Sequence, residues 1–337
     1  RTYHERGWPT YESLVARIIK VRHYGVWDPV IDVGKPSNRR SVLPPLSIAE
    51  FREKVGELHF TNGADREVVA SIYERTLRSA FGGASKLMFN SCGWGPAAAS
   101  SFAASLELCT RLETLNLEEN PLGDTGVCAL AAALAAGAAP ELTVLRLQRT
   151  GCGDAGLAAA LGALAAAAPK LEVFAFSENE ALGGEWPRAL ARAPLPALKY
   201  LSLESIAMGD AGVCAFAAAV AACAMPGLTD LGMQRTGCGD AGLAALAGAL
   251  AAGAPKLEEL DLSSNEVGDA EGLRALARAP LPALKRLLLC DIKLGDAGVC
   301  ALADEIACPA LEELFLNSVD AGDGGLEALG RALGRGA

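Results

Sequence analysis

Histidine and aromatic residues are scarce in this chain, and the three histidines and four of the five tyrosines precede residue 86. Aromatic residues make up 5% of the 337 residues, and His4, His23 and His59 are the only histidines. A working general base needs partners placed around it, and no Ser/His/Asp or Cys/His set has a recognisable spacing. We therefore expect no catalytic residues, no enzyme activity and no cofactor.

The ten cysteines form no C-x-x-C pair. Several of them recur at fixed points of repeated phrases, namely Cys128, Cys214 and Cys300 in "GVCA", and Cys152 and Cys238 in "TGCGDAG". Cysteines that recur at one point of a repeat meet one environment, most simply a buried one, so we interpret them as small apolar fillers and not as disulfide partners. This predicts free thiols that alkylate slowly and an intracellular, reducing compartment.

No stretch of the sequence indicates a membrane span or a secretory signal. Residues 211–228 carry no charge and are long enough to cross a bilayer on length alone. They are mostly alanine and align with charged copies of themselves, so we interpret them as a packed repeat. The chain begins at Arg1 without a methionine, and we expect a segment upstream of it.

Basic residues are fewer than acidic ones, with 30 Lys/Arg against 40 Asp/Glu, so the net charge is −10. Residues 1–85 hold 13 Lys/Arg and 10 Asp/Glu, whereas the remainder holds 17 and 30. The chain therefore has two parts of different composition. The basic run "NRR" at residues 38–40 is too short to bind nucleic acid in an acidic protein, so we expect no nucleic-acid partner.

What the sequence has in abundance is a repeated leucine pattern. The pattern L-x-x-L-x-L begins at Leu112, Leu142, Leu171, Leu198, Leu228, Leu257, Leu284 and Leu311, and a worn copy begins at Ala84. The steps are 30, 29, 27, 30, 29, 27 and 27 residues. The first three steps and the next three each span 86 residues, so a block of three repeats was duplicated. "TGCGDAGLA" at 150–158 and again at 236–244 is a product of that duplication.

This pattern resembles the leucine-rich repeat of the long, ribonuclease-inhibitor-like type, over residues 84–337. L-x-x-L-x-L alternates at the strand period, and the stretch that follows it spaces its apolar residues for a helix. We expect an α/β fold, a right-handed solenoid of about nine repeats over residues 86–337, with a curved parallel sheet and outer helices.

A Gly-Asp pair stands just before the expected helix in seven of the eight clear repeats. Aspartate at that point can accept hydrogen bonds from the free N–H groups of the first helical turn. We therefore predict structural helix caps at Asp124, Asp154, Asp210, Asp240, Asp269, Asp296 and Asp323. Calcium binding is the rival function, but acids that come once per repeat do not form an oxygen cage, so we expect no metal.

In repeats of this type an asparagine usually stands eight residues after the first leucine of the motif, but only some of the repeats here have it. Asn120, Asn179 and Asn265 keep it, and the other positions are Thr150, Ile206, Thr236, Ile292 and Val319. Its amide side chain usually ties neighbouring turns together, so apolar replacements should leave turn backbone groups to find other partners.

The N-terminal 85 residues predict helices over residues 10–21, 47–58 and 64–81, the second opened by a Ser-x-x-Glu capping box. A proline-rich connector separates the first two. A repeat stack needs a cap over its first core edge, and residues 1–85 are placed to provide it. The phrases "YHERGWPTYE" and "FTNGADREVV" resemble a group of leucine-rich repeat proteins from single-celled algae. That resemblance implies that residues 1–25 are the tail of a truncated upstream domain.

With no catalytic set in the sequence, we expect the function to lie in binding by surface residues. In this architecture the x residues of the motif line the concave face, and arginine and aromatic residues are enriched at binding hot spots. The candidate partner-binding residues are Arg146, Gln148, Arg149, Tyr200, Gln234, Arg235 and Phe315. Arg149 and Arg235, like Gln148 and Gln234, are duplicated copies of one position, which predicts the same chemistry twice.

We expect a non-catalytic scaffold that binds protein partners on its concave face, as a subunit of a larger assembly or as a recognition arm. The alanine-rich convex face is the competing surface. The resemblance leaves two alternatives open, an activator of a small GTPase and the recognition half of an immune-type receptor.

Overall fold

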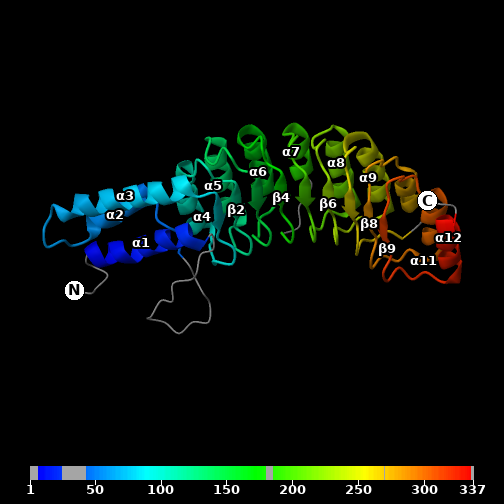
Figure 1. The fold of residues 1–337 in the computed structure, drawn as a ribbon, viewed down its shortest axis with the longest axis horizontal. Coiled ribbons are helices and arrows are strands. Elements are labelled where there is room, and N and C mark those ends of the chain that lie inside the picture. Colours follow the sequence, from blue (N-terminus) through cyan, green and yellow to red (C-terminus); the bar gives the residue numbers. More distant parts are fainter. Residues whose placement is uncertain (1–6, 25–42, 180–184, 269, 335–337) are drawn as a thin grey trace.

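Short strands and helices alternate along the chain and build one curved layer of strands under a layer of helices (Figure 1). The computed structural model describes residues 7–24, 43–179, 185–268 and 270–334. Nine parallel strands form one sheet in sequence order. The register pairs equivalent residues of successive repeats, such as Leu115 with Leu145 and Leu287 with Leu314. The predicted α/β solenoid with a curved parallel sheet is confirmed.

Each strand coincides with one copy of the leucine motif. The strands are β1 (Lys86–Met88), β2 (Thr114–Asn116), β3 (Val144–Arg146), β4 (Val173–Ala175), β5 (Tyr200–Ser202), β6 (Asp230–Gly232), β7 (Glu259–Asp261), β8 (Arg286–Leu288) and β9 (Glu313–Phe315). The helices of the repeats are α4 (Pro96–Ala103), the short 3-10 helix η2 (Leu106–Leu108), α5 (Gly123–Ala135), α6 (Asp154–Ala167), α7 (Glu185–Arg192), α8 (Gly209–Ala221), α9 (Asp240–Gly253), α10 (Ala270–Arg278), α11 (Gly295–Glu305) and α12 (Asp323–Gly334).

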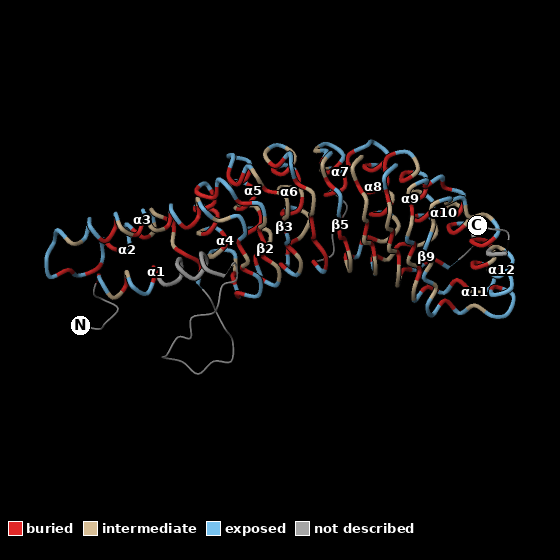
Figure 2. The backbone as a smooth tube through the Cα atoms, viewed as in Figure 1, coloured by how far each residue is buried: buried red, intermediate tan, exposed pale blue. Residues whose placement is uncertain are grey.

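The core lies between the sheet and the helices, where the motif leucines are buried (Figure 2). Leu115 and Leu117 of the β2 repeat are 1% and 0% exposed. Small residues let the helices approach closely, because a Cβ added at Gly253 of α9 would lie 1.9 Å from the Val220 carbonyl oxygen of α8. The uncharged run 211–228 is divided by the end of α8 at Ala221. In the described part of the chain, every helix is too short or too polar to cross a membrane.

Three helices precede the first strand, at the places the sequence predicts: α1 (Gly7–Tyr24), α2 (Ile48–Glu57) and α3 (Asp65–Gly83). The predicted capping box is confirmed, since the Glu50 nitrogen donates to Ser47 Oγ and the Ser47 nitrogen donates to Glu50 Oε2. Ser101 Oγ of α4 also donates to Glu50 Oε2, at 2.6 Å, and so joins α2 to the first repeat. Residues 1–6 and most of the expected proline-rich connector lie outside the described residues.

The repeated aspartates join neighbouring repeats instead of capping their own helices. Asp124 is the second residue of α5, and no side chain caps that helix. Its Oδ1 accepts hydrogen bonds from the nitrogens of Gly153 and Gly156, at 2.7 and 3.0 Å, where α6 of the next repeat begins. Asp210 and Asp296 bond in the same way to the starts of α9 and α12.

The prediction of caps within one repeat is therefore wrong for Asp124, Asp210 and Asp296. The reason is that stacking places the free N–H groups of the next helix beside each of these carboxylates. The side-chain caps of α6 and α9 thus come from Asp124 and Asp210 of the preceding repeats, while Asp154 and Asp240 are the first residues of their own helices. Asp240 Oδ2 instead accepts from the nitrogen of Gly268, at 3.1 Å. Asp323 is the first residue of α12, and Asp269 lies outside the described residues.

The asparagine ladder bonds backward, each amide to the preceding repeat. Asn265 Oδ1 accepts from the nitrogens of Thr236 and Cys238 and from Thr236 Oγ1, while its Nδ2 donates to the carbonyls of Met233 and Leu262. Asn179 does the same one block earlier. Thr150 and Thr236 thus replace the asparagine of their own repeats and also bond to the asparagine of the next repeat.

The turn after the buried Ile206 bonds to the backbone of the next repeat. The nitrogens of Met208 and Gly209 both donate to the Thr236 carbonyl, at 2.9 and 3.0 Å. Gly123, in the turn after Asn120, donates to the Thr150 carbonyl in the same way, so this bond does not depend on the replacement of asparagine. The expectation that turns next to apolar replacements find other partners stays a prediction.

The two sets of recurring cysteines differ in burial. Cys152 and Cys238 are 0% exposed, as expected. Cys128, Cys214 and Cys300 are only half-buried, so their prediction as buried fillers is wrong. Each of the latter lies on the flank of its helix, and Cys214 Sγ approaches the Ala241 carbonyl of the next helix at 3.9 Å. Burial raises the pKa of the Cys238 thiol to about 12, with Asp210 adding to the effect.

Candidate functional site

The candidate partner-binding residues lie in separate groups along the inner face of the sheet, as far as the structure describes the chain. Arg146 ends β3 with an exposed side chain, and Gln148 and Arg149 follow within three residues. Gln234 and Arg235 occupy the equivalent place after β6, three strands further on. Strands are spaced about 4.8 Å apart, which separates the two groups by roughly 15 Å.

Arg149 is held between two glutamates from the neighbouring repeats. Its Nη1 lies 2.6 Å from Glu119 Oε1, and its Nη2 and Nε lie 2.6 and 2.8 Å from the two carboxylate oxygens of Glu178. All three residues occupy the same position of successive repeats, with φ of 58°, 52° and 55°. Hydrogen bonds from Glu178 and then Glu119 raise the pKa of Arg149 above its ordinary value. Its charge is largely compensated within the chain.

Arg235 has a different environment, although it is the duplicated copy of Arg149. Serines take the places of the two glutamates, at Ser205 and Ser264. Arg235 Nη1 lies 3.8 Å from Glu204 Oε1, and the side chain is 66% exposed. The expectation of the same chemistry at both copies is therefore wrong for the arginines, because their neighbours differ. Arg146 is exposed and forms no ion pair with any described residue. Arg146 and Arg235 are thus the open cationic groups of this face.

Gln148 and Gln234 are closer to equivalent. Both are half-buried, and both have a buried Oε1 that finds no hydrogen-bond donor within the described ranges. The Nε2 of Gln234 donates to Asp261 Oδ2 at 2.5 Å. The two amides thus lie on the inner face directly before Arg149 and Arg235.

Apolar side chains lie at two places on the same face. Val144, Val173 and Tyr200 are paired in register on β3, β4 and β5. The two valines are half-buried and Tyr200 is 40% exposed. Phe315 ends β9 beside the half-buried Leu288 and is 38% exposed. Tyr200 therefore lies between the two arginine groups, whereas Phe315 lies at the far end of the sheet.

Two features of the site escaped the sequence reasoning. The glutamate partners of Arg149 become evident only when the repeats are aligned and the same position is compared across them. The half-burial of Leu311, Leu314 and Leu316, in the copy of the motif that forms β9, also went unpredicted. In the residues that the structure describes, no cluster of His, Cys, Asp and Glu could hold a metal ion.

An open parallel sheet under stacked helices, with a continuous inner face, defines a solenoid protein of the α/β class. The family model for the leucine-rich repeat matches residues 108–131 and 253–277. These matches, together with the repeated strand-and-helix unit, support a leucine-rich repeat protein.

No curated protein matches the chain. A solved structure titled "Crystal structure of TLR13-ssRNA13 complex" has 16% sequence identity and a TM-score of 0.39, over 65% of this chain and 30% of that one. This chain thus spans about a third of the length of that protein.

Proposed function

We propose that this protein is a non-catalytic scaffold that binds a protein partner on the concave face of its sheet. The observation that carries the proposal is the apolar row of Val144, Val173 and Tyr200 across β3, β4 and β5, with the exposed Arg146 two residues further along β3 and the exposed Arg235 after β6. Exposed apolar area beside arginine is typical of binding hot spots. The curved inner face of a repeat stack is the surface that such proteins commonly use.

The partner that fits this face presents apolar side chains flanked by two acidic points. Arg146 would meet one acidic point and Arg235 the other, and simultaneous contact strengthens binding through effective concentration. Gln148 and Gln234 would offer their unpartnered amide oxygens to hydrogen-bond donors of the partner. Arg149 contributes less, since Glu119 and Glu178 already compensate it. Phe315 is an outlying contact.

Photo-crosslinking from two positions of one repeat tests the proposal. A photoreactive amino acid replaces Tyr200 on the inner face in one variant and the exposed Ala218 of α8 on the outer face in the other. In an extract of the native source, the proposal expects crosslinked protein from position 200 and none from 218. Addition of Arg146→Glu and Arg235→Glu to the first variant should abolish the product. Crosslinks from 218 alone would place the interface on the convex face.

A further inference from the structure

One residue of each repeat has a positive φ, in the turn just after its strand, and these residues form a row across the repeats. Their φ angles lie between 52° and 58°. Since neighbouring strands are about 4.8 Å apart, the side chains of adjacent members of this turn row can reach one another. In chain order, the turn row consists of Ser91, Glu119, Arg149, Glu178, Ser205, Arg235, Ser264, Asp291 and Ser318.

The first four residues of the turn row are joined by hydrogen bonds. Ser91 Oγ donates to Glu119 Oε2 and Arg149 Nη1 donates to Glu119 Oε1, both at 2.6 Å. These two bonds, that from Ser91 first, lower the pKa of Glu119. Nε and Nη2 of Arg149 donate to the two carboxylate oxygens of Glu178. Ser91 and Arg149 thus have carboxylate acceptors within the chain.

The duplicated part of the turn row has the same kinds of donor without a carboxylate between them. Ser205, Arg235 and Ser264 follow one another there, so serines take the places of the two glutamates. Arg235 Nη1 lies 3.8 Å from Glu204 Oε1, which is too far for a hydrogen bond. Within the described ranges the guanidinium of Arg235 therefore donates no hydrogen bond, and its Nε and Nη2 are open to an acceptor.

We propose that Ser205, Arg235 and Ser264 form a binding site for the carboxylate of an acidic side chain on the partner protein. Arg235 donates to both of its oxygens, as Arg149 does to Glu178, and a serine hydroxyl adds a bond like that of Ser91. Paired, charge-assisted bonds of this kind are about twice as strong as neutral ones. The inference rests on the proposed function and adds the group that is bound and the two serines that leave room for it.

The charges around Arg235 favour a carboxylate over a phosphate group. Glu204 lies 3.8 Å from the guanidinium, Asp261 ends the neighbouring strand β7, and Asp291 belongs to the same turn row. A phosphate monoester carries about −1.5 to −2 charges at neutral pH, so these acids repel it more strongly than a carboxylate. A carboxylate is also the group that the chain itself places on Arg149.

The probe is a phage library of random short peptides. The library is first depleted on the double variant Ser205→Glu with Ser264→Glu, and the remaining phages are then selected on the wild-type chain. Glu119 and Glu178 show that this backbone position accepts glutamate, so the variant should keep its fold and compensate Arg235. The selected peptides should share an acidic residue. A synthetic copy should bind the wild type at least about tenfold more tightly than the double variant in fluorescence anisotropy.

A double-mutant cycle identifies the residue that receives the carboxylate. The shared acid of the peptide is changed to its amide, and Arg235→Gln is made in the protein. Each change alone should weaken binding at least about tenfold, and the two together should weaken it no further, because they remove the same contact. Phosphoserine in place of the acid should bind no more tightly than the acid. A selection without a shared acid, losses that multiply, or a tighter phosphopeptide would each overturn the inference.

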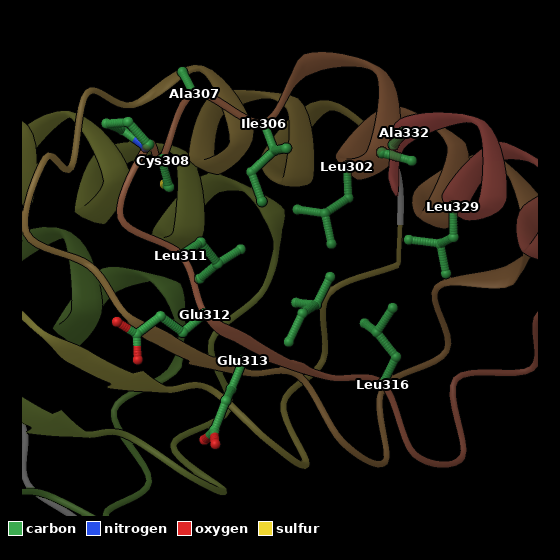
Figure 3. A pocket seen from close by; sticks show the side chains of 13 residues that line it. Leu302, Ile306, Ala307, Cys308, Leu311, Glu312, Glu313, Leu316, Leu329 and Ala332 are labelled. Atoms are coloured by element: carbon green, nitrogen blue, oxygen red, sulfur yellow. The ribbon is translucent and has the colours of Figure 1, made fainter. Parts of the chain in front are cut away.

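Ser318→Glu is the matched control, because it adds the same side chain to the same turn row three repeats from Arg235. It follows β9, in the repeat whose Leu311 and Leu316 line the apolar hollow shown in Figure 3. Peptide binding should be unchanged in this control, and a loss equal to that of the double variant would overturn the inference.

Crosslinking from position 200 separates this inference from the proposed function. Crosslinked protein from that position without any acid-dependent peptide would overturn the inference alone. Coupling between Arg235 and the acid of the peptide, without such a crosslink, would overturn the proposed function alone.

Discussion

Oδ1 of Asp210 lies 2.9 Å from the backbone nitrogen of Gly242, which belongs to the helix of the following repeat. The same oxygen accepts a hydrogen bond from the nitrogen of Gly239, at 2.7 Å. One carboxylate thus satisfies two of the four N–H groups that a helix start leaves free, and its charge is favourable at that end of the helix dipole. The Gly-Asp phrase is a joint between repeats, and this explains why a second glycine follows it.

Replacement of Gly242 by alanine should therefore destabilise the protein. A Cβ there would lie 2.7 Å from Asp210 Oδ1 and 3.1 Å from Val213 Cβ, and overpacking of this kind costs about 2 kcal/mol. Gly248, in the same helix, is exposed and has no atom within 4 Å of its added Cβ. Gly248→Ala should instead stabilise by about 0.5–1 kcal/mol. Urea unfolding of the two variants measures both, and equal shifts would show that the close contact is absent.

Asn265→Ala should cost about 3 kcal/mol of unfolding free energy. The change removes the acceptor for the nitrogens of Thr236 and Cys238, both in buried residues, and the donor to two carbonyls. Buried groups left without partners cost about 1–3 kcal/mol each. The exposed Asn317 is the control, and Asn317→Ala should stay within about 0.5 kcal/mol of the wild type. Thermal or urea denaturation of the pair tests the difference, and similar losses would contradict it.

Much of this fold could be predicted from the sequence because the leucine motif recurs at the period of the structural repeat. Each copy of the motif forms one strand, since alternate side chains must enter the core. The capping box of Ser47 and Glu50 likewise predicts the start of α2. The partner of each joint could not be predicted in the same way. Asp124 is adjacent in sequence to α5, and only the stacking of repeats brings Gly153 and Gly156 to it.

The candidate site was harder to predict than the fold, because identical local sequences have different neighbours. "QRTGCGDAGLA" surrounds both Arg149 and Arg235, yet glutamates flank the first and serines the second. Those flanking residues lie about one repeat away in the chain. The half-exposed position of Cys128 could not be predicted from the sequence either, because the residue before it, Val127, is buried. Repetition predicts that a position recurs, and the three-dimensional neighbours decide what it does.

Thiol labelling should follow burial and not the shared phrase. Cys223 is exposed and Cys128, Cys214 and Cys300 are half-buried, so these should react with iodoacetamide in the folded protein. Cys238, with its pKa raised to about 12 by burial, is hardly ionised at neutral pH and should stay unlabelled, as should the buried Cys152. Timed labelling followed by peptide mass spectrometry gives the order. Labelling in denaturant is the control, in which all of them should react alike.

Acid should weaken the contact between α2 and the first repeat. Burial alone would raise the pKa of Glu50, but hydrogen bonds from Ser101 and Ser47 outweigh it and lower the pKa below the ordinary 4.5. Because the folded pKa is the lower one, ionised Glu50 stabilises the fold above about pH 4.5, and this contribution disappears as the pH falls through the folded value.

Glu50→Gln removes this titration while keeping the shape of the side chain. The variant should be less stable than the wild type at pH 7, and the gap between the two melting temperatures should close as the pH falls below the ordinary carboxyl pKa of 4.5. The control is Glu53→Gln, on the exposed side of the same helix, whose melting curve should run parallel to the wild type. A gap for Glu50→Gln that stays constant across this range would mean that the carboxylate charge does not hold α2 to Ser101, and that shape alone does.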